Sequence, residues 1–502
     1  MINHSSVTPL AAPRSLMPGV QDLSCDPQLR SELSSPSTLT GEPMYAEQIS
    51  QFAKSTRLED IPEDVRERAK DLWLDSIGIA IASSRQDFAK ISIDALRSLS
   101  EESGSATVIG SSDKLPLRDA VHVNGVLIHG LDFDDTHTES LAHTSCTILP
   151  VVLALSELGN LAGDEALVSH VLGVEVATRI GLAAERGFHE NGHHSTAICG
   201  AFGAAVAASR LRGLSGPQMT MAQGIVGSMA AGSLEFLEEG AWVKRSHAGW
   251  AGVSAVTAAA LAQNGFTGPR TVYEGRYGIL SSHARANQEA RRDRLDCIPE
   301  LGKSWELMNV GIKPYPACLF THAFADAALA LRRGESFRIE DIQRIICPSS
   351  ELGVQMVFEP LAEKKMPTTA YAAQFSVPYI VAAALARSEF GIKELEADAL
   401  SDEAILNLAK KVSYTADPDT AFPKAFSGEV IIELANGKTI RHREQLNRGC
   451  AARPLTRADI IDKFFGNTDG LISQERANEI MESVLQIDRL PSLNTLMSLL
   501  RC

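Results

Sequence analysis

The sequence predicts a mainly α fold, with a large all-α domain and a smaller α+β domain. Apolar residues recur with helical periodicity through most of the first 300 residues. Two β-rich runs then flank a hairpin signal, and the tail returns to a helical pattern. We therefore expect an all-α domain over residues 44–305, completed by residues 455–502. The α+β domain, a candidate lid, is expected over residues 306–454.

The N-terminal residues differ from the rest of the chain. Residues 1–43 are rich in Ser, Pro and Thr and show no sustained apolar period, so we expect a disordered arm. Order should begin near Glu47. Pro62, followed by two acidic residues, predicts a helix start, because proline suits a first turn and carboxylates complement the helix dipole.

Later elements follow from apolar patterning. Five helices rich in Gly and Ala are expected at Ile148–Leu158, Glu165–Ala183, Ala197–Leu211, Pro217–Ala231 and Trp250–Asn264. The α+β part should contain a strand at Arg344–Pro348, helices at Phe375–Ala386 and Glu403–Val412, and a hairpin of Glu429–Leu434 and Lys438–Arg443. Asn436-Gly437 predicts a type I′ turn in that hairpin. The tail Glu475–Leu500 should be helical with a break at Pro491.

Composition excludes several classes of function. The 502 residues include 47 basic and 62 acidic ones, a net charge of −15 that disfavours nucleic-acid binding. No apolar run reaches the roughly 18–20 residues that span a bilayer, so we expect no membrane segment. Eight cysteines without a CxxC pair indicate a reducing compartment. We expect a cytoplasmic protein, because Arg14 alone among the first 20 residues gives little basis for a mitochondrial transit peptide.

One stretch concentrates ionisable side chains. Residues 130–143 hold four carboxylates and two histidines, among them Asp132 and His143. A solvated loop is the ordinary interpretation of such a run. The stretch lies between two apolar helices, however, and junctions of buried elements are where sites form.

A zinc-protease motif, H-E-x-x-H, occurs at His189–His193. That chemistry needs both histidines on one continuous helix, and the Asn191-Gly192 dipeptide in its middle favours a turn. We expect a loop here instead, with His194 just before a helix N-terminus, where it can face an anion.

Two basic segments indicate an anionic ligand. Lys244, Arg245 and His247 place three potential cations within four residues of an acidic protein. A helix C-terminus neutralised by basic residues is the alternative. Lys313 and Tyr315 lie in a segment extended by two prolines, for which a simple linker is the alternative.

Six segments in order resemble the MmgE/PrpD family, which includes 2-methylcitrate dehydratases, alkylcitrate dehydratases and cis-aconitate decarboxylases. The resemblance covers residues 45–500. The matching pieces are Asp132-Phe133-Asp134-Asp135-Thr136 with His143, His194 ahead of Gly200-Ala201-Phe202-Gly203-Ala204-Ala205, Lys244-Arg245-Ser246-His247-Ala248-Gly249, Tyr273-Glu274-Gly275-Arg276-Tyr277-Gly278, Lys313-Pro314-Tyr315-Pro316 and Ala373-Gln374-Phe375-Ser376.

The resemblance implies a helical domain with a lid, a homodimer, and catalysis without a metal or organic cofactor. It implies that the site residues are Asp132, Thr136, His143, His194, Lys244 and Lys313. Two features depart from the family pattern. The loop between Thr136 and His143 is one residue longer than in the mammalian decarboxylases, and the tyrosine expected after the first lid strand has no counterpart within Ser349–Phe358.

The residues suggest a division of labour on a polycarboxylate. Two lysines can hold carboxylates, and His143 and His194 titrate near neutrality, which suits an acid–base pair. Asp132 can orient and charge a histidine, and Thr136 can hydrogen-bond a carboxylate. The candidate catalytic residues are thus His143, His194, Asp132 and Lys244, and the candidate substrate-binding residues are Thr136, Lys313, Arg245, His247 and Tyr315.

We therefore expect a cofactor-free lyase acting on a citrate-type tricarboxylate. A 2-methylcitrate or alkylcitrate dehydratase is the first hypothesis, a cis-aconitate decarboxylase the second and an epimerase of an acidic substrate the third. Two other classes remain: a zinc hydrolase, and a non-catalytic helical interaction protein whose basic and histidine segments would lie far apart.

Overall fold

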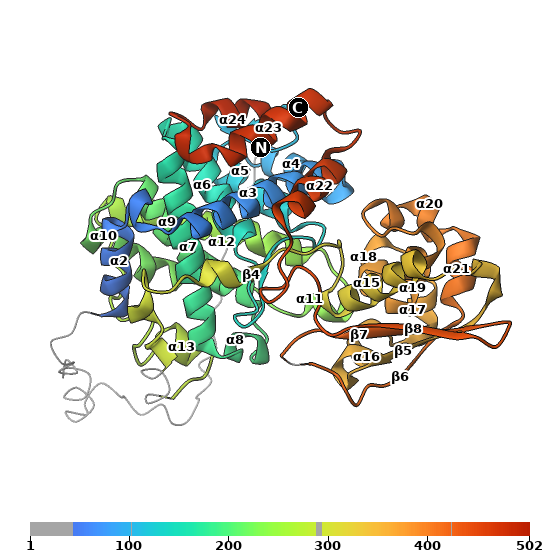
Figure 1. The fold of residues 1–502 in the computed structure, drawn as a ribbon. Helices are drawn as coiled ribbons and strands as arrows, with labels where there is room; N and C mark the ends of the chain where they lie inside the picture. The colour runs from blue at the N-terminus through green and yellow to red at the C-terminus, as the bar shows by residue number, and fades with distance from the viewer. Residues whose placement is uncertain (1–43, 102, 288–293, 423, 502) are drawn as a thin grey trace, which may run out of the picture. The chain divides into compact units, whose positions relative to one another are not determined.

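The computed structural model describes residues 44–101, 103–287, 294–422 and 424–501. The arm predicted over residues 1–43 lies outside the described residues. The chain from Met44 onward forms one compact unit with two hydrophobic cores, one lined mainly by helices and one between helices and a sheet. The two regions are seen side by side in Figure 1. The mainly α class with a smaller α+β region is confirmed, whereas the domain boundaries stay a prediction.

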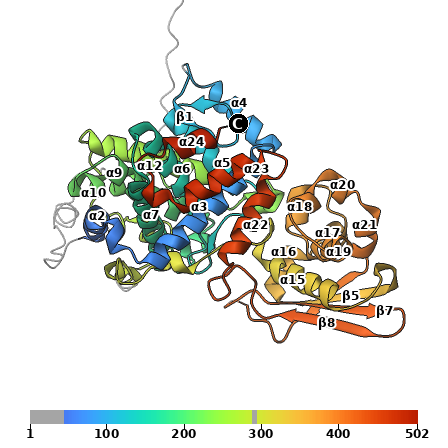
Figure 2. The same cartoon turned by 45° about the horizontal axis from the view of Figure 1, so that its top comes forward.

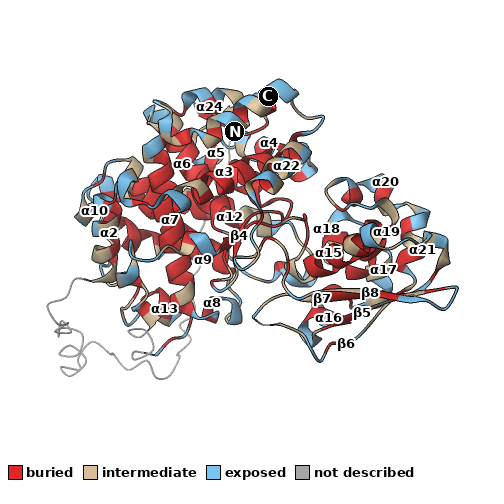
Figure 3. Ribbon diagram, viewed as in Figure 1, coloured by how far each residue is buried: buried red, intermediate tan, exposed pale blue. Residues whose placement is uncertain are grey.

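The first core is built from long helices packed through small side chains. The principal ones are α3 (Glu63–Ser83), α5 (Leu117–His129), α6 (Ser145–Gly159), α7 (Gly163–Ala184), α9 (Ser195–Leu211), α10 (Gly216–Val226) and α12 (Val243–Gln263). The shorter ones are α2 (Tyr45–Ser55), α4 (Asp87–Arg97), α8 (Gly187–Glu190), α11 (Phe236–Glu239) and α13 (Ile279–Ser282). Figure 3 shows the central helices buried almost throughout their length. α3 begins at Glu63, directly after Pro62, as the sequence predicts.

Helix α7 lies at the centre of this core. Among the described residues it is the one helix long and apolar enough to cross a membrane, judged by length and composition alone. Its most apolar window is 94% buried inside the protein, where α7 packs against α6 and α9. Its apolar character is therefore accounted for by the core.

The five predicted helices are all present, but two of them differ from the predicted bounds by five residues or more. α10 ends at Val226, and α12 begins at Val243, seven residues before the predicted start at Trp250. Apolar periodicity misses the first two turns of α12 because their side chains are basic and polar. Lys244 and Arg245 therefore lie at the N-terminal end of this helix, and the alternative of a neutralised helix C-terminus is wrong.

The C-terminal tail returns to the first core. α22 (Arg457–Thr468), α23 (Gln474–Leu485) and α24 (Asn494–Leu499) are its helices, and α22 packs along α3, as the turned view of Figure 2 shows. Phe464 and Ile480 are fully buried in that core. The predicted break at Pro491 is confirmed, since it lies between α23 and α24.

The second core lies against a four-stranded sheet with the order β6-β5-β7-β8. The strands are β5 (Ile342–Ser349), β6 (Val412–Ala416), β7 (Gly428–Leu434) and β8 (Thr439–Glu444). The helices are α15 (Leu319–Gly334), α16 (Glu351–Val357), α17 (Leu361–Lys365), α18 (Ala370–Gln374), α19 (Val377–Arg387), α20 (Ala397–Leu400) and α21 (Glu403–Ala409). β5 pairs with β6 in parallel and with β7 in antiparallel fashion.

The predicted strand, hairpin and helices of this region are confirmed, with two corrections. Val412 starts the parallel strand β6 instead of ending a helix. The hairpin turn is not type I′, because a type I′ turn needs positive φ at two residues and among the turn residues only Gly437, at 82°, has it. The Gly437 amide donates to the Leu434 carbonyl, which gives a longer loop with a left-handed glycine.

The zinc-protease interpretation is wrong. The short helix α8 ends at Glu190, and Gly192 adopts a left-handed φ of 79° before His193. His189 and His193 therefore do not lie one turn apart on a continuous helix. His194 occupies the N-cap position of α9, as the sequence predicts.

Candidate active site

A short ladder brings together two segments that are far apart in the sequence. β3 (Thr136–His137) pairs in antiparallel fashion with β4 (Val310–Gly311), with Thr136 opposite Gly311. Lys313 follows β4 by two residues, and Asp132 precedes β3 by four. The ladder therefore places Lys313 beside the acidic loop that follows α5.

Asp132 lies between two lysines. Its backbone is left-handed, with a φ of 51°, and Oδ1 lies 2.6 Å from Nζ of Lys244 and 3.1 Å from Nζ of Lys313. Nζ of Lys313 also donates to the Asp132 carbonyl at 2.8 Å. Burial disfavours the carboxylate, but the two lysines outweigh it and hold the pKa of Asp132 well below its usual range.

Lys244 remains charged in this interior position. Burial disfavours the ammonium group of Lys244, but Asp132 outweighs that effect and raises the pKa of Lys244 above its ordinary value. Lys313 is 3% exposed. Two cations share one carboxylate, so this group carries an excess positive charge that an anionic ligand can neutralise.

Close packing of glycines fixes Lys244 relative to the acidic loop. A Cβ atom built on Gly249 of α12 would lie 2.3 Å from the His122 carbonyl oxygen of α5, and one built on Gly125 would lie 2.6 Å from the Cα of Gly249. Only glycines allow this approach. α5 and α12 therefore deliver the acidic loop and Lys244 to the same place.

Lys463 of α22 supports the site from the C-terminal tail. Its Nζ donates to the carbonyl oxygens of Phe133, at 3.0 Å, and Lys313, at 2.8 Å. It also lies 3.6 Å from the centroid of the Phe133 ring. One buried ammonium group thus joins the acidic loop to the segment after β4.

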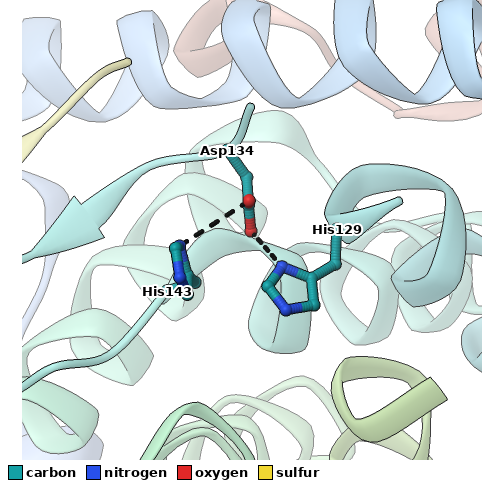
Figure 4. Close-up of side chains that lie close together, drawn as sticks. All are labelled: His129, Asp134 and His143. Carbon is teal, nitrogen blue, oxygen red and sulfur yellow. Dashed lines mark hydrogen bonds and ion pairs between the residues drawn. The ribbon is translucent and has the colours of Figure 1, made fainter. Parts of the chain in front are cut away.

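The next two aspartates serve different partners. Asp135 accepts hydrogen bonds from the backbone amides of Thr144, at 2.9 Å, and Ser145, at 3.2 Å, and so satisfies the N-terminus of α6. Asp134 is fully buried, and its Oδ2 lies 2.7 Å from Nδ1 of His129. Its Oδ1 lies 3.6 Å from Nδ1 of His143. Figure 4 shows Asp134 between the two imidazoles.

Hydrogen bonding assigns the working nitrogen of His143. Its Nδ1 lies 2.7 Å from the Asp135 carbonyl oxygen, which only accepts, so Nδ1 carries a proton and Nε2 is left for chemistry. Oγ1 of Thr136 lies 3.1 Å from the same Nδ1. Thr136 therefore contacts His143 as well as bordering the loop.

Four imidazole rings gather at this point. The ring of His129 lies 4.9 Å from that of His143 and 5.7 Å, nearly parallel, from that of His194. Nδ1 of His194 lies 3.1 Å from Nδ1 of His247. Burial lowers the pKa of His143 to about 3 and that of His247 to about 4, and it holds the pKa of His194 well below its usual range. Each of these three rings is therefore neutral near pH 7.

Arg245 borders the cluster, and Tyr315 does not. Nε of Arg245 donates to the Gly130 carbonyl at 2.7 Å, and its guanidinium lies over the ring of Tyr371. The Tyr315 hydroxyl instead donates to Asp326 at 2.7 Å inside the second core. None of the contacts described for Tyr315 reaches a histidine or lysine of the cluster, so its expected role in substrate binding gains no support.

Several residues of the site were missed by the sequence analysis. His129 and Asp134 lie at its centre, and Gln374 donates to the Leu131 carbonyl at 2.6 Å. Tyr371 supplies a phenol from α18, later in the chain than the segment in which a tyrosine was expected. His129 was detectable, because it ends an apolar helix directly before the acidic loop.

A cavity of about 1070 Å³ borders the cluster. Its walls include Leu131 and Arg245, the chain neighbours of Asp132 and Lys244, together with Tyr371 and Gln374. It is large enough for a tricarboxylate, which requires far less than this volume.

The donor set of His129, Asp134 and His143 also meets the basic requirement for a metal site. One ligand atom from each residue lies within 4.8 Å of the others. In the structure, however, Asp134 already hydrogen-bonds His129, and Nδ1 of His143 faces a carbonyl oxygen. Histidine ligands need a free lone pair, so a metal at this set would have to displace the bonds at the two Nδ1 atoms or bind through the Nε2 atoms.

Comparisons with known proteins agree with the geometry. The model of the MmgE/PrpD N-terminal domain matches residues 47–291, and that of the MmgE/PrpD C-terminal domain matches residues 315–487. A cis-aconitate decarboxylase of Aspergillus terreus (strain NIH 2624 / FGSC A1156) is 28% identical over 91% of this chain and 95% of its own length. A cis-aconitate decarboxylase of Mus musculus is 27% identical over 89% of this chain and 91% of its own length.

A cis-aconitate decarboxylase-like protein of Aspergillus oryzae (strain ATCC 42149 / RIB 40) is 26% identical over 92% of this chain and 98% of its own length. The two domain models together cover most of the chain, and the site carries the residues through which the resemblance was first seen. The chain belongs to the MmgE/PrpD family and is a lyase.

Proposed function

We propose that this protein is a cofactor-free carboxy-lyase that decarboxylates cis-aconitate or a close tricarboxylate analogue. The observation that supports it most is the convergence of Lys244 and Lys313 on Asp132 beside His143 and His194. The similarity to decarboxylases over about nine tenths of the chain favours this reaction over the dehydration that the sequence analysis placed first.

The cations supply the binding energy for the substrate carboxylates. Lys244 and Lys313 carry more charge than Asp132 neutralises, and Arg245 adds a third cation at the edge of the cavity. Fixing two carboxylates in this way orients the third for loss as carbon dioxide. Electrostatic stabilisation is strong here because Asp132 and Lys313 are buried and the side chain of Lys244 is only 13% exposed.

The imidazoles supply the proton chemistry. Loss of carbon dioxide leaves an electron pair on carbon, and one proton must replace the departing group. Nε2 of His143 can accept a proton in this chemistry, because Nδ1 donates to the Asp135 carbonyl oxygen. His194 and His247 lie next to it as a hydrogen-bonded pair.

A direct assay separates the reactions of this family. Purified protein is incubated with cis-aconitate, 2-methylcitrate and longer alkylcitrates, and carbon dioxide and the organic products are followed by gas analysis and proton NMR. We expect carbon dioxide from cis-aconitate. Loss of water from 2-methylcitrate without carbon dioxide from cis-aconitate would establish a dehydratase, and inversion at carbon without either would establish an epimerase.

Lys313→Gln is the matched test of the site, and His283→Asn, a partly exposed histidine away from the cluster, is its control. We expect the first variant to lose most of the activity and the second to keep it. A chelator should leave the rate unchanged if catalysis needs no metal.

We also propose that the protein is a homodimer and that it is located in the cytoplasm. Analytical ultracentrifugation tests the first proposal and cell fractionation tests the second.

A further inference from the structure

His129 and Asp134 form a buried hydrogen-bonded pair. His129 is the last residue of α5, and the left-handed turn at Asp132 folds the loop back so that Asp134 meets it. The distance from Nδ1 to Oδ2 is 2.7 Å, and both side chains are fully buried. Burying a carboxylate costs several kcal/mol unless it is paired. The pairing with His129 therefore offsets the cost of placing Asp134 in the interior.

The Asp134 carboxylate interacts more closely with His129 than with His143. Burial disfavours its carboxylate, yet His129 and then His143 outweigh burial and hold the pKa of Asp134 far below its usual value. Its hydrogen bond is to His129, whereas Nδ1 of His143 is 3.6 Å away and is bound to a carbonyl oxygen. A proton added to His129 is therefore stabilised by a full negative charge at hydrogen-bond distance.

The second nitrogen of His129 is available. Nε2 is buried and has no hydrogen-bond partner among the described residues, and Figure 4 shows it on the side of the ring away from Asp134. Without a partner, this nitrogen is free to bind a ligand or to exchange a proton. The ring centroids of His143 and His194 lie 4.9 Å and 5.7 Å from that of His129, so this imidazole lies within the histidine cluster.

We propose that His129 is the catalytic acid of the decarboxylation and that Asp134 is the positioning residue that keeps its ring oriented and charged. This inference rests on the proposed function. Of the four imidazoles in the cluster, His129 is the one whose ring is hydrogen-bonded to a carboxylate. The other three rings contact a carbonyl oxygen or each other.

The bond between carbon and the departing carboxylate breaks, and its electron pair delocalises through the adjacent double bond into a remaining carboxylate. The Nε2–H bond of the His129 imidazolium breaks as a new C–H bond forms. His129 becomes neutral while Nδ1 still donates to Asp134, and it regains a proton from water after the product leaves. One proton is consumed for each carbon dioxide released.

Two substitutions isolate the parts of this unit. His129→Asn keeps an amide donor near the position of Nδ1 but removes Nε2, and Asp134→Asn keeps an acceptor but removes the charge. His322→Gln is the control. His322 is equally buried and, among the described residues, also has one ring nitrogen without a partner, Nδ1, but its Nε2 lies 3.0 Å from the Ala317 carbonyl oxygen and its ring is not bonded to a carboxylate. Circular dichroism and thermal unfolding establish that each variant is folded.

Turnover, its pH profile and deuterium exchange are then measured. We expect both variants to lower kcat by about 100-fold or more, the range of a general acid, with KM changed less than about threefold. The rate at which product hydrogens exchange with D2O should fall in parallel. In Asp134→Asn the decline in rate at high pH should begin at a lower pH. A folded His129→Asn protein with kcat within threefold of the wild type and an unchanged profile overturns the assignment while leaving the decarboxylase intact.

A second measurement tests the role of His129 in case the variants do not fold or the wild-type protein releases no carbon dioxide. Histidine labelled with ¹⁵N reports the protonation of each ring in complex with tricarballylate, an unreactive tricarboxylate. We expect both nitrogens of His129 to be protonated in that complex. A neutral Nε2 with the ligand bound overturns the role of His129, whatever reaction the protein catalyses. Absence of carbon dioxide from wild-type protein contradicts the proposed function alone.

Discussion

The Nδ1 atoms of His194 and His247 lie 3.1 Å apart, on two different helices. Because one imidazole must donate the hydrogen that the other accepts, the pair fixes opposite tautomers in the two rings. Whichever nitrogen of His194 meets a ligand is therefore set by His247.

His247→Asn and His247→Leu test this relationship. Asparagine can still donate to or accept from Nδ1 of His194, whereas leucine leaves that nitrogen buried without a partner. We expect a loss of kcat below about tenfold for asparagine and above about 100-fold for leucine, a range typical of a lost acid–base orientation. Equal losses in steady-state assays of the two folded variants would contradict a tautomer-setting role.

Asp132→Asn should improve ligand binding and impair turnover. The carboxylate competes with a ligand for Lys244 and Lys313, and asparagine tolerates the left-handed backbone at this position. We expect tricarballylate to bind about tenfold more tightly. The Asp132 carboxylate is negative like the ligand, and removing its repulsion of the ligand is worth about 1 kcal/mol or more. Isothermal titration calorimetry measures this. Weaker binding would show that Asp132 helps to hold the ligand.

Binding of a tricarboxylate should take up protons. Burial keeps the pKa of His143 near 3 and that of His247 near 4 in the free protein. A bound polyanion favours the imidazolium form and raises these values, so protons enter with the ligand. At pH 7 we expect an uptake of about one proton per site, seen as a dependence of the calorimetric enthalpy on buffer ionisation. No dependence on the buffer would argue against imidazoles at the anion.

His170 predicts a measurable pH dependence of stability. Burial lowers its pKa to about 3 in the folded protein. The unfolded chain therefore binds the extra proton between pH 6.5 and 3, and this histidine costs stability as pH falls through that window, by about 1.4 kcal/mol per pH unit. His170→Asn should remove this slope.

Urea unfolding of wild-type and variant protein at pH 7, 6 and 5 measures the difference. The comparison cancels the opposite contribution of buried carboxyls such as Glu175, whose pKa burial raises to about 7. Parallel stability curves for the two proteins would mean that His170 is protonated in the folded state.

Gly249→Ala should separate α5 from α12. A methyl group there would meet the His122 carbonyl oxygen at 2.3 Å, so we expect a loss of about 1–3 kcal/mol in the free energy of unfolding. Turnover should fall too, because Lys244 moves with α12. Gly466→Ala is the control: it adds a methyl group to α22 where nothing lies within 4 Å, and it should be neutral or stabilising by about 0.5–1 kcal/mol. Full activity in Gly249→Ala would contradict this role.

Periodicity predicted the order of the helices well, because their apolar faces are long. Periodicity failed where polar side chains of the candidate site take the place of apolar ones on a helix. The first turns of α12 carry Lys244 and Arg245 instead of core residues, so the predicted start of this helix lies seven residues too late. β6 was read as a helix end because Val412 is followed by half-buried polar residues, and parallel pairing with β5 depends on a distant segment that a local pattern does not reveal.

The site itself was predictable only in part. Asp132, His143, His194, Lys244 and Lys313 were found by their charge or by the motifs that carry the family resemblance. His129 was missed because a histidine on an apolar helix is usually a core residue. Tyr315 was included because it follows Lys313 closely in the sequence, and its role in substrate binding stays a prediction. Neighbours along the chain can belong to different cores, as Lys313 and Tyr315 do.

The contact between Gln374 and the Leu131 carbonyl gives the α+β region a direct hold on the peptide that precedes Asp132. Any movement of α18 away from the helical core must break that bond and release the left-handed turn at Asp132 to readjust. Asp132 in turn bonds both lysines, so a single amide side chain links the position of α18 to the geometry of the two cations.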